Sequence, residues 1–306
     1  MLVAAYVQGN EVIDNSDKPP LISYTEKGAD TCIKCHDEDN TYPVFPIFKT
    51  KHAQQADLRT PFADLQCEAC HGAGKEHAKK TKQGEPQAPI LNFAKHSTNS
   101  PVEQNKSCLN CHENYQRISW KGSIHERNDL RCVDCHTVHT ENDDVLSRDK
   151  QSKVCFQCHS KERAETYKPS AHPIRYGQMN CSDCHNTHGS FTPEQLIKNT
   201  INETCYTCHA EKRGPVLWQH APVAEDCSIC HVAHGSNHPA LLKKRTFLLC
   251  KECHSQAGHP SLTPNGNALP GNSDKFFNRF SLVNGCLNCH SLVHGSNHPS
   301  GMKFMR

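Results

Sequence analysis

The chain of 306 residues is short of the side chains from which an ordinary globular core is built. Only 35% of its residues are hydrophobic and 7% are aromatic, with 2 Trp and 4 Met. A chain of this length would normally form about two domains, but these side chains cannot fill two cores. No window approaches 18 consecutive apolar residues, so we expect no bilayer-spanning helix. The apolar interior must therefore come from something other than side chains.

Cysteine, by contrast, is abundant and regularly placed. The 20 cysteines all fall in ten copies of Cys-x-x-Cys-His, which we number 1 to 10 along the chain. On one helical turn, positions i, i+3 and i+4 lie side by side. Two thiols can therefore reach one porphyrin edge and add to its vinyl groups, while the adjacent histidine binds the iron. The motif is the attachment signature of c-type haem, and the sequence predicts ten haem c groups.

Each motif supplies two thioether bonds and one proximal iron ligand. The predicted covalent attachment residues are Cys32, Cys35, Cys67, Cys70, Cys108, Cys111, Cys132, Cys135, Cys155, Cys158, Cys181, Cys184, Cys205, Cys208, Cys227, Cys230, Cys250, Cys253, Cys286 and Cys289. The predicted proximal ligands are His36, His71, His112, His136, His159, His185, His209, His231, His254 and His290. Five motifs follow a residue that could cap the turn, namely Thr31, Ser107, Asn180, Thr204 and Asp226.

Three other uses of paired cysteines fit the pattern less well. A tetrahedral zinc site has no need of a histidine after every second cysteine. A secreted disulfide framework would space its cysteines irregularly, and a redox dithiol would occur once, in a βαβ unit.

The remaining histidines suffice for a second axial ligand on each iron. Of 23 histidines, ten are proximal, which leaves 13. The candidate distal ligands are His52, His77, His125, His139, His172, His188, His220, His234, His259 and His294. His139, His188 and His234 come only three residues after a proximal ligand, so they cannot fold back to the opposite face of their own haem and should bind neighbouring haems. His96, His238 and His298 are the expected spares.

The repeat of motifs predicts the fold class and the organisation of the chain. Successive motifs imply a quasi-linear assembly in which each unit contacts its neighbours. We expect a mostly irregular, elongated multihaem cytochrome with short α-helices, almost no β-structure and a core of stacked haems. The predicted parts are a leader remnant or N-terminal extension (1–30), a first pentahaem half (31–160), a second pentahaem half (161–301) and a tail (302–306).

The charge of the chain argues against nucleic acid as a partner. The formal net charge is +2, but each ferric haem adds two propionates against one positive charge at the iron, so the loaded molecule is acidic. Lys and Arg side chains are better explained as partners of propionates than as a nucleic-acid surface. The opening MLVAAY resembles the end of an export signal, and haem attachment of this type takes place outside the bacterial cytoplasm.

Local sequence matches point to a family. LQCEACHG at 65–72, NETCYTCHAEKRGPVLW at 202–218 and GCLNCHSLVHGSNHPSG at 285–301, together with ten motifs in this spacing, resemble the decahaem cytochromes of the MtrA, MtoA and DmsE group. The resemblance runs from about Ala29 to Gly301. It implies bis-histidine iron throughout and a periplasmic location, associated with the outer membrane through a β-barrel porin.

The resemblance also implies a function and partners. The expected function is electron conduction across the outer membrane inside a porin, between periplasmic or inner-membrane cytochromes and an extracellular acceptor or donor, through a surface multihaem cytochrome or reductase. We expect no enzyme activity and no catalytic residues, because a histidine is available for every iron and a catalytic haem needs an open position. The alternatives are a soluble periplasmic electron shuttle or store and, less well supported, a multihaem reductase.

Overall fold

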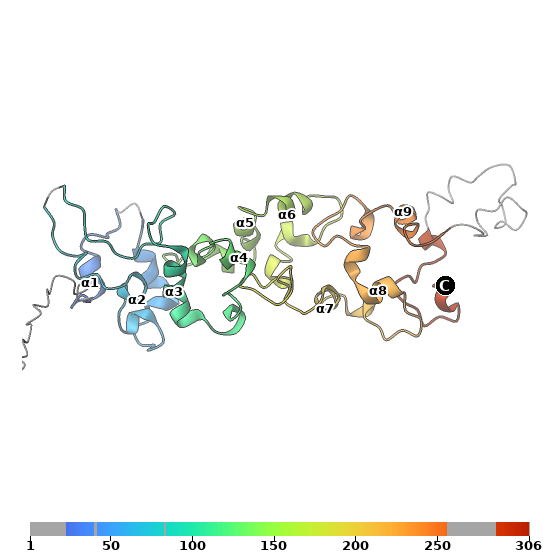
Figure 1. Ribbon diagram of the computed structural model, residues 1–306, viewed down its shortest axis with the longest axis horizontal. Helices are drawn as coiled ribbons and strands as arrows, with labels where there is room; N and C mark the ends of the chain where they lie inside the picture. The colour runs from blue at the N-terminus through green and yellow to red at the C-terminus, as the bar shows by residue number, and fades with distance from the viewer. Residues whose placement is uncertain (1–22, 40–41, 83, 256–285, 306) are drawn as a thin grey trace, which may run out of the picture. The chain divides into compact units, whose positions relative to one another are not determined.

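The computed structural model describes residues 23–39, 42–82, 84–255 and 286–305 (Figure 1). In these residues the chain forms short α-helices and 3₁₀ helices joined by irregular segments, and no strands beyond isolated bridges. The fold class predicted from the sequence is therefore confirmed. None of the described helices is long and apolar enough to cross a membrane.

The α-helices are brief, and in the described ranges only one exceeds six residues. They are α1 (Ala29–Cys32), α2 (Glu68–His71), α3 (Pro101–His112), α4 (Ile124–Arg127), α5 (Gln151–Cys155), α6 (Ser160–Glu165), α7 (Ile201–Tyr206), α8 (Ala221–Glu225) and α9 (Thr246–Cys250). The 3₁₀ helices are η2 (Phe45–Lys49), η3 (Lys51–Ala53), η4 (Pro61–Ala63), η5 (Tyr115–Arg117), η6 (Cys132–Asp134), η7 (Asp144–Leu146), η8 (Pro173–Tyr176), η9 (Cys181–Asp183), η10 (Ala210–Lys212), η11 (Cys227–Ile229), η12 (Pro239–Leu241), η13 (Cys286–Asn288) and η14 (Gly301–Lys303).

The motifs alternate between two kinds of local structure. Each odd-numbered motif has its first cysteine near the end of, or within, an α-helix, whereas motifs 4, 6, 8 and 10 open a 3₁₀ helix. Predicted caps are confirmed at Asn180 and Asp226, which precede η9 and η11; Asp226 accepts the Ser228 N–H at 2.6 Å. The other three predicted caps, Thr31, Ser107 and Thr204, are wrong because they lie inside α1, α3 and α7. In α7, Thr200 is the cap.

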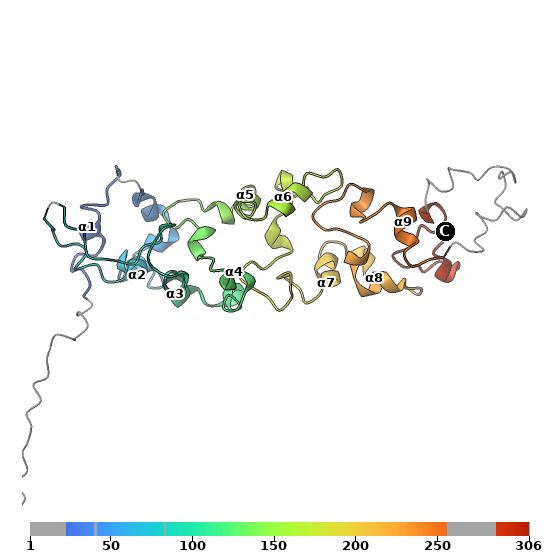
Figure 2. The same cartoon turned by 45° about the horizontal axis from the view of Figure 1, so that its top comes forward.

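Contacts divide the chain into two compact units, residues 1–100 and 101–306. The sequence placed its division at 160/161, by counting haems, and that grouping into pentahaem halves stays a prediction. In the second unit, helices α3 to α9 follow one another in chain order along the unit (Figures 1 and 2). Its packing therefore runs between neighbours in sequence, as expected for a repeat assembly.

Side chains by themselves form almost no closed core in the described residues. The buried hydrophobic residues are Ala29, Phe62, Trp120, Ile174 and Leu196. Large apolar side chains such as Phe191 and Leu58 are 98% and 90% exposed. The apolar surface that these side chains leave open agrees with the shortage of hydrophobic residues noted in the sequence.

A repeated contact joins the loops after motifs 6, 8 and 10 to segments that lie earlier in the second unit. Gly189 packs so tightly on Ser119 that a Cβ atom would overlap the Ser119 carbonyl, and Gly235 packs in the same way on Glu165. After motif 8, Ser236 and Ser170 exchange backbone hydrogen bonds of 3.1 and 2.7 Å. These close approaches fix the loop after motif 6 against the segment that precedes His125, and the loop after motif 8 against the segment that precedes His172.

Candidate haem centres

Each motif forms a single closed turn. In nine motifs the histidine N–H donates to the carbonyl of the first cysteine at 2.9 to 3.0 Å, and motif 3 lies wholly inside α3. The turn places both thiols and the imidazole on one side, as attachment to one porphyrin requires. All 20 cysteines are free of disulfides.

Seven proximal candidates each lie opposite a second histidine. In every case the partner is one of the predicted distal ligands, and the ring centroids are 6.1 to 6.4 Å apart. The pairs are His36 with His77, His125 with His159, His136 with His188, His172 with His209, His185 with His234, His220 with His254, and His231 with His294.

This separation matches two imidazoles that bind one metal ion from opposite sides. A metal–nitrogen bond of about 2 Å, followed by about 1 Å from the nitrogen to the centre of its ring, puts the two centroids about 6 Å apart. Direct stacking of two rings would allow a closer approach. The residues present therefore fit a haem iron between each pair.

The pairs follow a rule that the sequence alone did not give. Distal candidates after motifs 3, 5 and 7 face the proximal histidines of motifs 5, 7 and 9, two motifs ahead. Those after motifs 6, 8 and 10 face motifs 4, 6 and 8, two motifs back. His188 and His234 thus lie away from the turn of their own motif, as the three-residue spacing predicted. In the first unit, His77 faces the histidine of motif 1.

The distal ligands of motifs 2, 3 and 10 stay predictions, with His52, His139 and His259 as their candidates. His259 lies outside the described residues. Of the two histidines in the last HGSNHP segment, His294 forms a pair with His231. His298 accepts the Ser300 N–H through Nδ1 at 3.2 Å, and its assignment as a spare stays a prediction.

The Nδ1 atoms of many of these imidazoles are occupied by the protein. Eight of them bond to backbone carbonyls at 2.5 to 3.1 Å. The bonds join His71 to Leu91, His77 to Ala88, His125 to Thr187, His172 to Ala233, His185 to Glu194, His220 to Val293, His231 to Ala240 and His290 to Lys303. Such bonds fix the ring orientation and leave Nε2 for the metal.

Burial keeps several of these imidazoles neutral. Desolvation is the main cause that lowers the pKa of His188 to about 4. It also lowers the pKa values of His71, His234 and His294. A histidine must be neutral to bind a metal, so the environment favours the ligating form.

First cysteines of neighbouring motifs also meet in pairs. A hydrogen bond with the first thiol of the next motif is the largest cause that raises the pKa of the Cys32, Cys108 and Cys155 thiols. Motifs 7 and 8, and motifs 9 and 10, show the same thiol contact. The attachment edges of the haems in each such pair are therefore adjacent.

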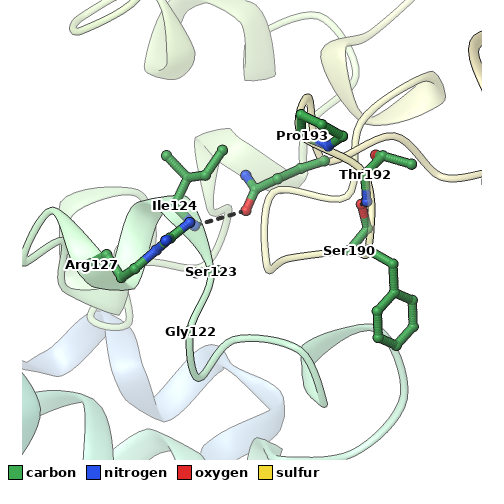
Figure 3. Close-up of a pocket in the computed structure, with 9 residues that line it drawn as sticks. Gly122, Ser123, Ile124, Arg127, Ser190, Thr192 and Pro193 are labelled. Carbon is green, nitrogen blue, oxygen red and sulfur yellow. Dashed lines mark hydrogen bonds between the residues drawn. The ribbon is translucent and has the colours of Figure 1, made fainter.

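A crevice in the second unit adjoins one of these centres. Figure 3 shows it between the start of α4 and the loop 190–195, where the Ile124 N–H donates to the Gln195 side chain at 3.2 Å. It has a volume of about 460 Å³, with Arg127 and Phe191 in its lining. Ile124 directly precedes His125, so the crevice belongs to the surroundings of that pair.

Motif turns, facing imidazoles and oriented Nδ1 atoms together define a multihaem c-type cytochrome. The chain matches the family model for the doubled CXXCH motif at residues 172–214 and 220–259, and the model for NrfB-like cytochrome c-type proteins at 67–154.

Comparison with individual proteins shows the family. The chain is 50% identical over 284 residues to the multihaem cytochrome MtrA of Shewanella baltica (strain OS185), a match that covers 93% of this chain and 83% of that protein. It therefore belongs to the MtrA family of multihaem electron-transfer cytochromes. Cytochrome c-type protein NrfB is more distant: 27% identity in Escherichia coli O6:H1, over 47% of this chain and 72% of the relative, and 24% in Haemophilus influenzae, over 43% and 65%.

Proposed function

We propose that this chain carries ten haem c groups and conducts electrons across the outer membrane inside a porin. On the periplasmic side it would exchange electrons with periplasmic or inner-membrane cytochromes. On the outer side it would exchange them with an extracellular acceptor or donor, through a surface multihaem cytochrome or reductase. The observation that carries the proposal is the set of seven facing histidine pairs, which recur in phase with the motifs.

The ligand set suits electron transfer and not substrate turnover. An iron between two imidazoles has no open axial position, so it gains and loses an electron without binding a substrate. Bis-histidine ligation without methionine also favours low potentials, because Met/His ligation raises them. The oriented Nδ1 bonds hold each ring in place, which reduces the rearrangement that accompanies a change of charge.

Electron passage along the chain is supported by the contacts between consecutive motifs. First cysteines meet within the pairs 3–4, 5–6, 7–8 and 9–10 of the second unit. Second cysteines lie near one another across the gaps between those pairs, as Cys135 does to Cys158 and Cys184 to Cys208. From motif 3 to motif 10, each haem thus has a neighbour in chain order.

Location and porin partner rest on the family. The 50% identity to a multihaem cytochrome named MtrA extends over most of both chains, and the resemblance to the MtrA group is the basis on which we propose a porin partner. Haems that follow one another in chain order would suffice to cross the hydrocarbon thickness of about 30 Å.

Reconstitution tests the proposal. Liposomes that contain a redox dye, the co-expressed porin and the haem-loaded cytochrome should exchange electrons with an external reductant. Liposomes with the porin alone, or with the cytochrome alone, are the controls and should not. Equal conduction by the cytochrome alone, or failure of any porin to bind it at micromolar concentration, would refute the conduit.

A soluble periplasmic shuttle is the second candidate, favoured by the similarity of residues 67–154 to NrfB-like cytochromes. The shuttle requires the same haem ligation but no porin. It predicts fast electron exchange with a soluble partner cytochrome in the absence of any membrane, together with no co-purifying porin.

A further inference from the structure

The proximal His136 has a different kind of Nδ1 acceptor from His71, His185, His231 and His290. His136 donates to the Asp143 carboxylate at 2.7 Å, whereas the eight bonds described above go to neutral carbonyls. Glutamates near His159, His209 and His234 lie 3.5 to 3.8 Å away, which is beyond hydrogen-bond distance. Asp143 therefore bonds to a candidate iron ligand at a shorter distance than these three glutamates do.

The internal repeat supplies a direct comparison. Motifs 4, 6 and 8 each open a 3₁₀ helix and are each followed three residues later by a distal candidate. In motifs 6 and 8, the proximal His185 and His231 donate to backbone carbonyls nine residues downstream. In motif 4 the corresponding acceptor is the side chain of Asp143, seven residues downstream. The same position thus carries a negative charge in one repeat and a neutral dipole in two.

Asp143 is held in place by the backbone around it. Its other carboxylate oxygen accepts the N–H of Thr137 at 3.3 Å and that of Val145 at 3.4 Å. Its side chain is only 14% exposed. The nearby Lys150 pairs with Asp144 at 3.0 Å instead, and within the described part of the chain no Lys or Arg makes an ion pair with Asp143. Its charge therefore acts on His136 without neutralisation.

We infer that Asp143 lowers the reduction potential of the motif 4 haem below those of the motif 6 and motif 8 haems, so that it is reduced last of the three. A carboxylate that accepts the imidazole N–H gives the ring partial imidazolate character, and charge-assisted bonds are about twice as strong as neutral ones. The stronger donor stabilises Fe(III) relative to Fe(II). This inference rests on the proposed function in one respect, the ligation of iron by His136 and His188.

A lowered potential at this place shapes electron flow in the second unit. The motif 4 haem has neighbours on both sides through the cysteine contacts of motifs 3 and 5. An electron that passes along the chain must enter it and leave it. Under partial reduction, the motif 4 haem would therefore stay oxidised and separate the reduced haems before it from those after it.

Asp143→Asn tests the inference in the haem-loaded protein. If the amide oxygen keeps the Thr137 and Val145 N–H groups, an NH2 group replaces the oxygen that accepted from Nδ1, so the variant removes both the negative charge and the acceptor of the His136 N–H. In an optical redox titration, we expect the part of the absorbance change that corresponds to one haem to shift to higher potential. Asp144→Asn is the matched control, because it removes the same charge one residue away and Asp144 bonds to no imidazole. It should leave the reduction potential of the motif 4 haem unchanged.

Electron paramagnetic resonance gives a second readout that a purely structural role would not move. A stronger axial donor narrows the spread of the g-values of low-spin Fe(III), so Asp143→Asn should widen the spread for one signal. In the unaltered protein, the signal with the narrow spread of g-values should persist to lower potentials than the signals of the motif 6 and motif 8 haems. Equal shifts in Asp143→Asn and Asp144→Asn, or no narrow signal at low potential in the unaltered protein, would overturn the inference.

Failure of the ligation can be told apart from failure of the inference. Integration of the low-spin signals in the unaltered protein measures the number of irons with two histidine ligands. A full low-spin count with no effect of Asp143→Asn would refute the potential difference alone. A high-spin iron in the unaltered protein that disappears when motif 4 is removed by Cys132→Ser/Cys135→Ser would refute the ligation itself.

Discussion

Two buried asparagines hold neighbouring motifs together, and their removal should loosen the second unit locally. Asn202 is 8% exposed, lies three residues before motif 7 and accepts the N–H of Cys227, the first residue of motif 8, at 2.7 Å. Its amide donates to the carbonyl of Val223 at 3.0 Å. Asn105, 5% exposed, makes the same two kinds of bond to Cys132 and Leu130 at 2.8 and 2.9 Å.

The expected cost follows from the groups that lose their partners. Asn202→Ala removes the Asn202 partner of one N–H and two carbonyls, and each buried unsatisfied group costs about 1–3 kcal/mol. We take about 3 kcal/mol for these groups together, which corresponds to about a hundredfold in the local opening constant. Asn202→Asp keeps the acceptor but loses the donor, so its effect should be intermediate.

Hydrogen–deuterium exchange of the haem-loaded protein measures this opening. The amide of Cys227 should exchange about a hundredfold faster in Asn202→Ala, because local opening exposes it. Asn128→Ala is the control, since the Asn128 amide donates to Ile124 at 2.7 Å on an exposed surface, where the loss should stay within about 0.5 kcal/mol. Less than a tenfold change in Asn202→Ala, or the same change in both variants, would refute the reasoning.

Three further predictions concern the irons. His188→Ala should leave the motif 4 iron with one ligand, so that one haem becomes high-spin and binds carbon monoxide; if removal of the motif 6 haem abolishes the signal instead, the pairing of His188 with His136 is wrong. The rings of His125 and His159 meet at 74° and those of His136 and His188 at 9°, so the paramagnetic resonance spectrum should contain both a strongly anisotropic signal and a rhombic one; a spectrum of one type would contradict these angles. Each added electron raises the pKa of nearby propionates, so the reduced protein binds more protons and the potentials should fall as pH rises; identical titration curves at pH 6 and pH 8 would exclude this.

Local chemistry was predictable from the sequence, and long-range pairing was not. Motif spacing gave the haem turns, and the three-residue gap before His188 already excluded its own haem. Motif spacing could not predict which haem His188 faces. His188 comes 52 positions after His136, and their approach depends on the path of the chain between them. A count of histidines in phase with motifs carries no information on that path.

Caps and second acceptors show a similar limit. Thr204 reads as a cap because it precedes Cys205, yet helix α7 begins earlier, at Ile201, since sequence propensity fixes helix ends poorly. The sequence did not predict a role for Asp143, because an aspartate in a polar loop is common. Its spacing of seven residues from His136 was the available signal, and a comparison with the loops after motifs 6 and 8 could have found it.

Each distal histidine in the second-unit pairs faces a haem two motifs away, and this also sets the order in which the irons gain their second ligand during maturation of the protein. If the chain is delivered from its N-terminal end and haems are attached as motifs emerge, the motif 4 iron waits for its second ligand until His188 has followed. The motif 5 iron, by contrast, finds His125 already present when His159 appears. Motifs whose distal ligand lies later in the chain should therefore pass through an open, ligand-binding state. Motifs whose distal ligand lies earlier should not, and a chain stopped after motif 5 should retain the open state at motif 4.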